Sequence, residues 1–504
     1  MLESRNLYSH YRKGFPKDLD SMLLETDKGD NFSYKEAESL SAKLANGLKA
    51  LGIQPGDRVT VQVEKSPMAL WLYLACLRGG FVFHPLNTAY KEHELEYFLE
   101  NASPSLVVCD PSLYDMVHKL SSRLMIKHVK TLSAEGQGSL LEIISDDDCF
   151  ETFKASKDSL AALLYSSGTT GRPKGIMLTH ENLYTNAETL TSYWGFTQND
   201  RLLHALPTFH VHGLFVALGC VFCSGASMRW LQSFDAKSVV PHLEECTVMM
   251  GVPTYYTRLL KEESFCRDSA SNMRLFISGS APLLEETFND FNELTGHSIL
   301  ERYGMSETNM NSSNPLVGER VAGTVGLPLP GVEIRITNEF NEALPADEIG
   351  NLQVKGKNVF KGYWQMPEKT VEDFTADGFF NTGDKGVIDK KGYLAIVGRS
   401  KDMIITGGLN VYPKEVELLI DEIEGVQESA VIGLPDEDFG EMVAAVIVMK
   451  ISNELTEGKV QEILKNLVAN FKVPKKIFFS QELPRNAMSK VQKNILRESY
   501  SKKL

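Results

Sequence analysis

A loop rich in glycine and hydroxyl side chains, set between two apolar runs, constrains this chain more than any other segment. Residues 164–175 read LYSSGTTGRPKG. Glycine accepts backbone angles and close approaches that other residues resist, so several main-chain N–H groups can point at one anion. The hydroxyls add donors, and Lys174 adds positive charge. The segment therefore predicts a phosphate-binding loop.

This loop differs from the Walker phosphate loop, in which the lysine directly follows the last glycine and a helix begins. Pro173 precedes Lys174, which disfavours a helix around the lysine. No Ser or Thr follows the lysine to bind magnesium, and the next residues, Gly175–Leu178, form a β-type run. We therefore expect a strand, the loop and a second strand.

Length and charge indicate a globular protein with more than one domain. The 504 residues exceed what one ordinary hydrophobic core contains. The net charge is −14, and acidic and basic residues are interspersed, which argues against a nucleic-acid surface. The most apolar uncharged stretch, Gly213–Met228, is shorter than the ~20 residues of a membrane-spanning helix. We expect neither nucleic-acid binding nor stable membrane insertion.

The cysteines and the N-terminus favour a cytoplasmic protein. Seven scattered cysteines cannot all pair, which is typical of a reducing compartment. Cys220 and Cys223 form a lone CxxC pair inside an apolar run, and we interpret them as small core residues. The segment Met1–Arg5 lacks the apolar core of a secretory signal.

Periodicities along the first half predict an α/β fold. Ser33 and Glu36 form a capping-box pattern, and leucines at regular intervals behind them indicate a helix that ends at Gly52. Alternating valines over residues 59–63 predict a strand with one buried face. A step from helix to strand is expected around Tyr97–Asp110.

The residues after 401 predict a smaller α/β unit. We expect a helix from about Lys414, strands at Ala430–Ile432 and Val443–Met449, and a helix from Thr456. A change of composition precedes this unit, where Gly and Asp residues punctuate short β-type runs as far as Gly398.

Five further motifs follow the loop in a fixed order. They are Pro207–Leu214, Glu301–Glu307, Thr382–Asp384, Gly398–Asp402 and Pro484–Lys490. With the loop, they make the chain resemble the adenylate-forming superfamily of acyl-CoA synthetases, nonribosomal adenylation domains and luciferases. Within it the chain is most similar to malonyl-CoA synthetases, through Phe209–Gly213, Glu301–Met305 and Thr308–Asn311.

The resemblance implies an α/β fold with a large N-terminal domain of several subdomains and a small, mobile C-terminal α+β domain. The N-terminal domain, residues 1–400, is expected to bind ATP and the acid; the mobile domain comprises residues 401–504, with the hinge at about Lys401-Asp402. The implied cofactors are ATP, Mg²⁺ and coenzyme A as co-substrate. AMP is transferred from ATP to a carboxylic acid, and the thiol of coenzyme A then displaces it. Both steps need positioning and charge neutralisation rather than a protein nucleophile.

The resemblance assigns most motif residues to the nucleotide and the metal. Glu307 matches the magnesium-binding glutamate, Asp384 the carboxylate that accepts the ribose hydroxyls, and Arg399 an arginine that reaches the nucleotide. Lys490 matches the lysine that contacts the substrate carboxylate and the α-phosphate during adenylation. The expected catalytic residues are Lys490, Glu307, Lys174 and Thr169. The expected nucleotide-binding residues are Ser166, Ser167, Gly168, Thr169, Thr170, Gly171, Arg172, Pro173, Lys174, Ser280, Ala281, Pro282, Glu301, Tyr303, Gly304, Met305, Ser306, Asp384, Arg399 and Lys490.

The expected acid is a short dicarboxylate. Many relatives have a small residue before Tyr-Gly-Met-Thr-Glu, where this chain has Arg302. A buried guanidinium without an anionic partner is costly, so a substrate carboxylate is a natural partner, and an internal acid is the alternative. His210 and His212 flank the same expected pocket. Malonate fits a site that holds one carboxylate while the other is adenylated.

Several alternatives keep part of this chemistry. The same two steps on methylmalonate, oxalate or another short acid use the same nucleotide site, whereas Arg302 argues against medium-chain or aromatic acids. Loading of a carrier protein is a further alternative, as is a luciferase-like oxygenase with the same fold. A nucleotide-sensing protein is disfavoured by Glu307, Arg399 and Lys490. The expected partners are the small molecules malonate, ATP and coenzyme A; the sequence sets no oligomeric state.

Overall fold

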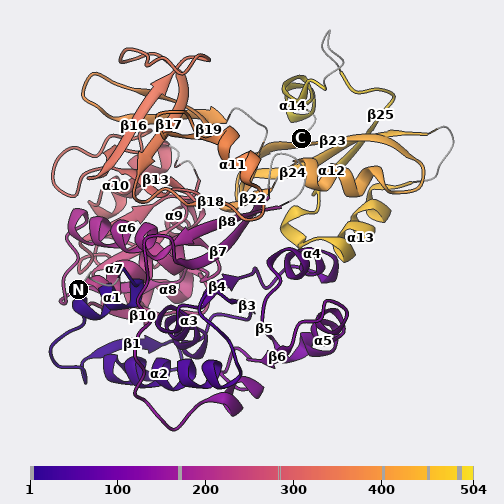
Figure 1. Cartoon of the computed structure of the whole chain (residues 1–504). Helices are drawn as coiled ribbons and strands as arrows, with labels where there is room; N and C mark the ends of the chain where they lie inside the picture. Colours follow the sequence, from indigo (N-terminus) through magenta and orange to yellow (C-terminus); the bar gives the residue numbers. More distant parts are fainter. Residues whose placement is uncertain are drawn as a thin grey trace. The chain divides into compact units, whose positions relative to one another are not determined.

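The chain folds into two compact units of mixed α/β structure (Figure 1). The computed structural model describes residues 5–167, 173–281, 283, 285–399, 403–411, 413–450, 455–484 and 491–502. The first unit comprises Met1–Thr88, Leu99–Leu164 and Gly175–Gly398; the second comprises Ala89–Phe98, Tyr165–Lys174 and Arg399–Leu504. The α/β prediction is confirmed. The expected hinge at Lys401-Asp402 lies outside the described residues, and the boundary at residue 401 stays a prediction.

Two large sheets of mainly parallel strands organise the residues before 399. Among the described residues, one has nine strands in the order β15-β14-β13-β12-β11-β9-β10-β1-β2, and the other has seven in the order β18-β8-β7-β4-β3-β5-β6. The strands of the nine-stranded sheet are β1 (Met22–Thr26), β2 (Asn31–Ser33), β9 (Arg201–His204), β10 (Ser227–Trp230), β11 (Val248–Gly251), β12 (Leu275–Ser278), β13 (Leu300–Met305), β14 (Asn309–Ser313) and β15 (Leu327–Pro328). Those of the seven-stranded sheet are β3 (Arg58–Gln62), β4 (Val82–Pro85), β5 (Leu106–Cys109), β6 (His128–Thr131), β7 (Leu160–Ser167), β8 (Pro173–Thr179) and β18 (Gly362–Tyr363).

The helices in this part of the chain begin where the sequence provides caps. Helix α2 starts after Ser33, whose hydroxyl accepts the N–H of Glu36 while the Glu36 carboxylate accepts the N–H of Ser33. The chain leaves this helix through Gly52 at φ +88°, so the predicted start and end are both confirmed. The helices are α1 (Leu7–Gly14), α2 (Tyr34–Ala50), α3 (Pro67–Gly79), α4 (Glu92–Ala102), α5 (Tyr114–Arg123), α6 (His180–Tyr193), α7 (Leu218–Ser224), α8 (Ala236–Leu243), α9 (Pro253–Leu260), α10 (Glu285–Thr295) and α11 (Pro367–Asp373), with short η1 (Pro111–Leu113), η2 (Ser139–Ile143) and η3 (His212–Ala217).

Strand β3 differs from its prediction. The alternating valines predicted one buried face, but Val59–Gln62 are buried without alternation. The reason is that β3 lies between β4 and β5 in parallel register. A central parallel strand is covered on both faces, and therefore polar side chains such as Thr60 are buried beside the valines.

Strands β7 and β8 flank the predicted phosphate loop. The strand, loop and strand arrangement is confirmed for its two strands, whereas Gly168–Arg172 lie outside the described residues. Two aromatic residues of α4 contact the two arms. The Tyr97 hydroxyl donates to the carbonyl of Pro173 at 2.7 Å, and the Phe98 ring packs edge-on against Tyr165. The expected step from helix to strand is α4 followed by β5.

A four-stranded sheet completes the first unit. Its strands β16 (Val332–Thr337), β17 (Gly350–Gly356), β19 (Phe380–Ile388) and β20 (Leu394–Arg399) follow one another in that order. The first three are labelled in Figure 1. Pairing of β17 with β16 and β19 is antiparallel. Asp384 lies on β19 of this sheet.

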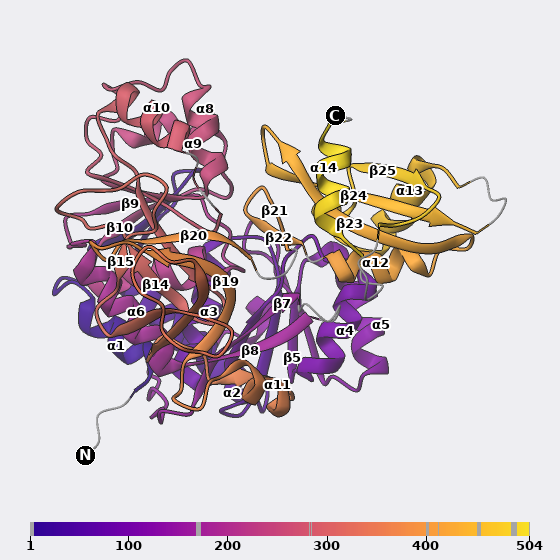
Figure 2. The ribbon, with the colours of Figure 1, turned by 90° about the horizontal axis from the view of Figure 1, so that it is seen from above.

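The C-terminal part of the second unit is a small sheet with three helices (Figure 2). Its described elements are β21 (Ile404–Thr406), β22 (Leu409–Val411), α12 (Pro413–Asp421), β23 (Val426–Asp436), β24 (Gly440–Met449), α13 (Glu457–Leu467), η4 (Asn470–Lys472), β25 (Lys476–Ser480) and α14 (Lys493–Ser501). Thr456 caps α13 as predicted. The two expected strands lie inside the longer β23 and β24, which pair antiparallel.

No described helix is both long and apolar enough to cross a bilayer. The apolar stretch that drew attention in the sequence forms η3 and α7 instead, and its residues pack in the core of the first unit.

Candidate active site

Arg302 lies on β13 and is 3% exposed. Its Nη2 lies 3.5 Å from the hydroxyl of Ser280. A Cβ atom added to Gly279 would stand 2.5 Å from the guanidinium carbon, so the charged group lies directly against the Gly279 backbone. The Arg302 guanidinium therefore packs against the backbone of the segment that follows β12.

The charge of Arg302 is buried without a matching acid among the described residues. There its Nε has no hydrogen-bond partner. Burial lowers the pKa of Arg302 to about 9, and the Tyr256 hydroxyl opposes that effect. The alternative of pairing with an internal carboxylate finds no support in the described part of the chain. Because an isolated buried charge is costly, this arrangement suits an anion that arrives from solution.

His212 approaches the same hydroxyl as Arg302. Its Nδ1 lies 3.4 Å from Ser280 Oγ, while its buried Nε2 has no partner among the described residues. Burial, followed by the Arg302 charge, holds the pKa of His212 well below its usual value, so the ring is neutral. Ser280 itself has φ +75°, a strained conformation for a residue with a side chain and one that recurs at functional sites.

His210 lies differently from His212. It is exposed, and its ring contacts that of Phe209 with the centroids 4.6 Å apart. The structure therefore brings Arg302, His212 and Ser280 together. His210 is accessible to solvent, but the protein around it lowers the pKa of His210 to about 4, and its ring interacts electrostatically with His212.

The expected nucleotide residues of the first unit include a linked pair. The Tyr303 hydroxyl donates a hydrogen bond to Asp384 Oδ2. Asp384 is buried, and its N–H donates to the Thr382 hydroxyl at 3.1 Å. Gly383, between them, has φ +77°, a conformation that favours glycine. The predicted turn Thr382–Asp384 thus exists and aims its carboxylate at Tyr303.

Glu301 is buried at the start of the same motif. Burial and the neighbouring Glu285 charge work against ionisation of its carboxyl group, whereas the backbone of Leu283 and Gly323 favours it, and its Oε1 has no hydrogen-bond partner among the described residues. Burial is the larger effect and raises the pKa of Glu301 to about 8. The carboxyl group joins the segment after Ser280 to the loop that contains Gly323.

Glu307 is buried beside β18. The hydroxyl of Tyr363 lies 3.4 Å from Glu307 Oε1, and the N–H of Phe360 donates to the Glu307 carbonyl at 2.7 Å. A carboxylate oxygen is a hard ligand of the kind that magnesium prefers, and magnesium at such sites takes one or two carboxylates plus phosphate oxygens. The Glu307 carboxylate therefore fits a magnesium ion.

The remaining expected residues are distributed as follows. Gly304 and Met305 end β13, Ser306 lies in the turn that leads to β14, and Ala281 follows Ser280. Ser166 and Ser167 end β7, Pro173 and Lys174 begin β8, and Arg399 ends β20. Gly168, Thr169, Thr170, Gly171, Arg172, Pro282 and Lys490 lie outside the described residues, as do the side chains of Ser167 and Arg399.

Two site residues were missed by sequence reasoning. Gly279 makes room for the guanidinium, and Tyr363 contacts Glu307. The position of Gly279, directly before Ser280 and after a β-type run, was a visible signal of close backbone approach. Tyr363 follows Glu307 by more than fifty residues, and no local pattern announces the contact.

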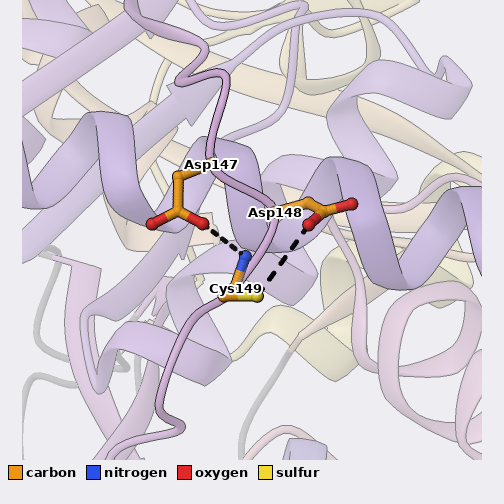
Figure 3. A group of neighbouring side chains, drawn as sticks. All are labelled: Asp147, Asp148 and Cys149. Atoms are coloured by element: carbon orange, nitrogen blue, oxygen red, sulfur yellow. Dashed lines mark hydrogen bonds between the residues drawn. The ribbon is translucent and has the colours of Figure 1, made fainter.

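Other candidates from the sequence have structural roles. Cys220 is buried in α7 and Cys223 is half-buried, both as free thiols, as predicted. The exposed trio Asp147, Asp148 and Cys149 shapes its own loop, since Asp147 accepts the N–H of Cys149 at 2.9 Å (Figure 3).

The fold and this set of motifs define an adenylate-forming enzyme. The chain belongs to the AMP-binding enzyme family, whose profile matches residues 14–364, and the AMP-binding enzyme C-terminal domain matches residues 415–490. Family members use ATP, and enzymes of the CoA-ligase branch use coenzyme A.

Similar proteins indicate which kind of adenylate-forming enzyme this chain resembles. A crystal structure of ATP-bound MatB from Rhodopseudomonas palustris is 50% identical, covers 99% of both chains and superposes with a TM-score of 0.79. A malonyl-CoA ligase with methylmalonyl-CoA and AMP bound is 31% identical, covering 94% of this chain and 99% of that one, with a TM-score of 0.81. The malonate–CoA ligase of Arabidopsis thaliana is 33% identical over 95% of this chain and 86% of its own length.

Proposed function

We propose that this protein is an ATP-dependent, AMP-forming malonate–CoA ligase. A malonate carboxylate oxygen attacks the α-phosphorus of ATP, the bond to the β-phosphate breaks, and malonyl adenylate and pyrophosphate result. The thiol of coenzyme A then loses its proton and attacks the acyl carbon. AMP departs, and malonyl-CoA is formed.

The observation that carries malonate as the acid is the buried Arg302 charge. Its guanidinium rests on Gly279, shares the Ser280 hydroxyl with neutral His212, and has no carboxylate partner among the described residues. A carboxylate held there accepts charge-assisted hydrogen bonds from Arg302, and the unpaired Nε2 of His212 supplies a further donor. The distal carboxylate of malonate is then fixed while the other one reacts.

The relatives support the same acid. Their names specify malonate or methylmalonyl-CoA, and the similarity extends over most of both chains. Methylmalonate differs from malonate by one methyl group, which a hydrophobic contact discriminates only ~10- to 200-fold. Malonate is the substrate of this proposal, and methylmalonate is a measurable second one.

The remaining assignments belong to the proposal because they rest on matching motifs. Lys490 contacts the reacting carboxylate and the α-phosphate, and Lys174 with the loop before it contacts the β- and γ-phosphates. Asp384 accepts the ribose hydroxyls. Glu307 holds magnesium, which neutralises phosphate charge when bound.

Two features of the organisation complete the proposal. Residues 401–504 form a mobile domain that turns about Lys401-Asp402 between the two half-reactions, so that Lys490 serves only the first. The seven free cysteines fit a reducing compartment, and we place the reaction in the cytoplasm.

Replacement of Arg302 by Met tests the acid assignment. Loss of one partner of a buried charge pair costs about 2–5 kcal/mol, so kcat/KM for malonate should fall roughly 30-fold or more while the KM for ATP stays within about twofold. Arg335→Met, which removes a more exposed pair with Asp377, is the control and should leave both constants unchanged. Unchanged malonate kinetics in the Arg302 variant would contradict the assignment.

A further inference from the structure

A buried lysine contacts the strand that precedes the histidine motif. Lys65, just after β3, is 6% exposed. Its Nζ donates to His204 Nδ1 at 2.8 Å, to the His204 carbonyl at 2.7 Å and to the Leu231 carbonyl at 2.7 Å. Nζ also lies 4.3 Å from the centroid of the Trp230 ring. The Lys65 ammonium thus lies among three acceptors and an aromatic face.

These contacts match the three donors of a charged Lys65. An ammonium has three N–H donors and finds three acceptors here, whereas a neutral amine has only two. The face of Trp230 favours the cation as well. Burial acts in the opposite direction and lowers the pKa of Lys65, while the charge of Asp27 raises it. The four contacts therefore favour the charged form, against the burial that holds the pKa of Lys65 well below its usual value.

The same contacts set the tautomer of His204. The carbonyl oxygen of Gly213 can only accept, so His204 Nε2, at 3.0 Å from it, carries the ring proton. Nδ1 is then the acceptor that Lys65 needs. Burial, followed by the charge of Lys65, lowers the pKa of His204, which agrees with a neutral ring. The Gly213 carbonyl therefore sets the tautomer of His204, and Lys65 holds the ring from its other nitrogen.

The accepting carbonyl belongs to the residue after His212. Gly213 lies in η3, a π-helix, and π-helical turns are rare and concentrate at functional sites. A Cβ atom at Gly213 would stand 2.1 Å from the Pro207 carbonyl oxygen, so the Gly213 backbone packs closely against Pro207. On its carbonyl, Gly213 accepts the hydrogen bond from His204. These contacts restrain Gly213 and the peptide that follows it, directly after His212 in the chain.

We propose that Lys65 and His204 are positioning residues of the acid pocket. Lys65 orients His204, His204 holds the Gly213 carbonyl, and the neighbouring His212 is thereby aimed at the site that it shares with Ser280 and Arg302. Neither residue contacts the acid. The inference rests on the proposed function, because it assigns this relay to the recognition of malonate.

Kinetics of Lys65→Met test the relay. The substitution removes the three donors with little change in side-chain length, and the KM for malonate should rise about tenfold, with the KM for ATP within about twofold. Lys35→Met, at an exposed lysine paired only with exposed Asp20, is the matched control and should retain wild-type constants. Equal increases in both KM values would show a general structural role and would overturn the proposal.

A double-mutant cycle shows whether Lys65 acts through His212. If it does, Lys65→Met should change the KM for malonate less than about twofold in a His212→Ala background. A full tenfold effect in that background would reject the relay even though malonate remains the substrate. Wild-type enzyme without malonate turnover would instead reject the proposed function, so the two failures are distinguishable.

A pair of His204 variants covers the case in which Lys65→Met does not fold. His204→Gln retains a donor for the Gly213 carbonyl and an acceptor for Lys65, whereas His204→Phe retains only the ring packing against Trp230. The Gln variant should keep the KM for malonate within about threefold, and the Phe variant should raise it about tenfold. Equal values for the two variants would contradict the relay.

Discussion

The phenol of Tyr303 donates a hydrogen bond to the carboxylate of Asp384 and so joins β13 of the nine-stranded sheet to β19 of the four-stranded sheet. Arg302, one residue earlier on β13, instead contacts Ser280. Successive side chains of a strand point to opposite faces, and β13 therefore presents Arg302, the proposed acid-binding residue, on one face and Tyr303, which is bonded to Asp384, on the other. One strand thus contributes to both the proposed acid site and the proposed nucleotide site.

Tyr303→Phe separates the hydrogen bond from the aromatic ring. A hydrogen bond to a charged acceptor contributes about 1.5–3 kcal/mol, so loss of the hydroxyl should raise the KM for ATP roughly tenfold and leave the KM for malonate nearly unchanged. Initial rates at varied ATP measure the effect. Tyr114→Phe, at a partly exposed tyrosine of α5, is the control. A Phe variant with wild-type ATP kinetics would show that Asp384 needs no orientation by Tyr303.

Gly279→Ala should disturb the acid pocket through sterics alone. The added methyl group would stand 2.5 Å from the Arg302 guanidinium carbon, so the guanidinium must move away from residue 279. We expect the KM for malonate to rise at least about fivefold, because a displaced guanidinium loses its alignment with a carboxylate. Gly458→Ala adds a methyl group into open space on α13 and is the matched control. An unaffected KM in the Gly279 variant would mean that the guanidinium does not bind malonate in the position described.

Glu301 makes the stability of the protein depend on pH. Burial raises its pKa from 4.5 to about 8. Between these values the folded protein holds a proton that the unfolded chain has released, so the free energy of unfolding should fall as the pH rises and level off above about 8. In Glu301→Gln this contribution is absent, and the melting temperature should fall less between about pH 6 and pH 8.5 than in the wild type.

The exposed Glu286 supplies the control for that comparison. Glu286→Gln should reproduce the pH dependence of the wild-type melting temperature. The interpretation of Glu301 fails if all three proteins lose the same number of degrees over this interval.

Lys490→Ala should divide the two half-reactions. Exchange of pyrophosphate into ATP in the presence of malonate should fall by at least about 100-fold, because a cation that meets the reacting oxygens in the transition state is gone. Formation of malonyl-CoA from supplied malonyl adenylate should stay within about threefold of wild type. Lys459→Ala, at an exposed position of α13, is the control. Parallel losses in both half-reactions would argue against alternate use of two domain orientations.

Local sequence signals predicted much of this fold. The Ser33 capping box, the Thr456 cap and the proline before Lys174 each act within a few residues, and the elements that they predict are present. The buried face of β3 was not predicted correctly, because the number of covered faces depends on neighbours that lie far away in the chain.

The site residues differ in the same way: those in local motifs were predicted, and those that depend on distant contacts were not. Arg302 and His212 were recognised from their motifs, and they meet at Ser280. Lys65 and its partner His204 were not recognised, since they are 139 residues apart and neither lies in a motif. A lone lysine in a sequence is indistinguishable from a surface lysine, and only the packed structure reveals that its donors are all used.

The most direct measurement is AMP release by the wild-type enzyme with ATP, magnesium and coenzyme A across a panel of acids. The panel comprises malonate, methylmalonate, oxalate, succinate, acetate, octanoate and 4-coumarate. We expect the highest kcat/KM for malonate, with acetate at least about 100-fold lower because it offers Arg302 no second carboxylate. A preference for acetate, octanoate or 4-coumarate would contradict the assignment of Arg302 as the malonate-binding residue.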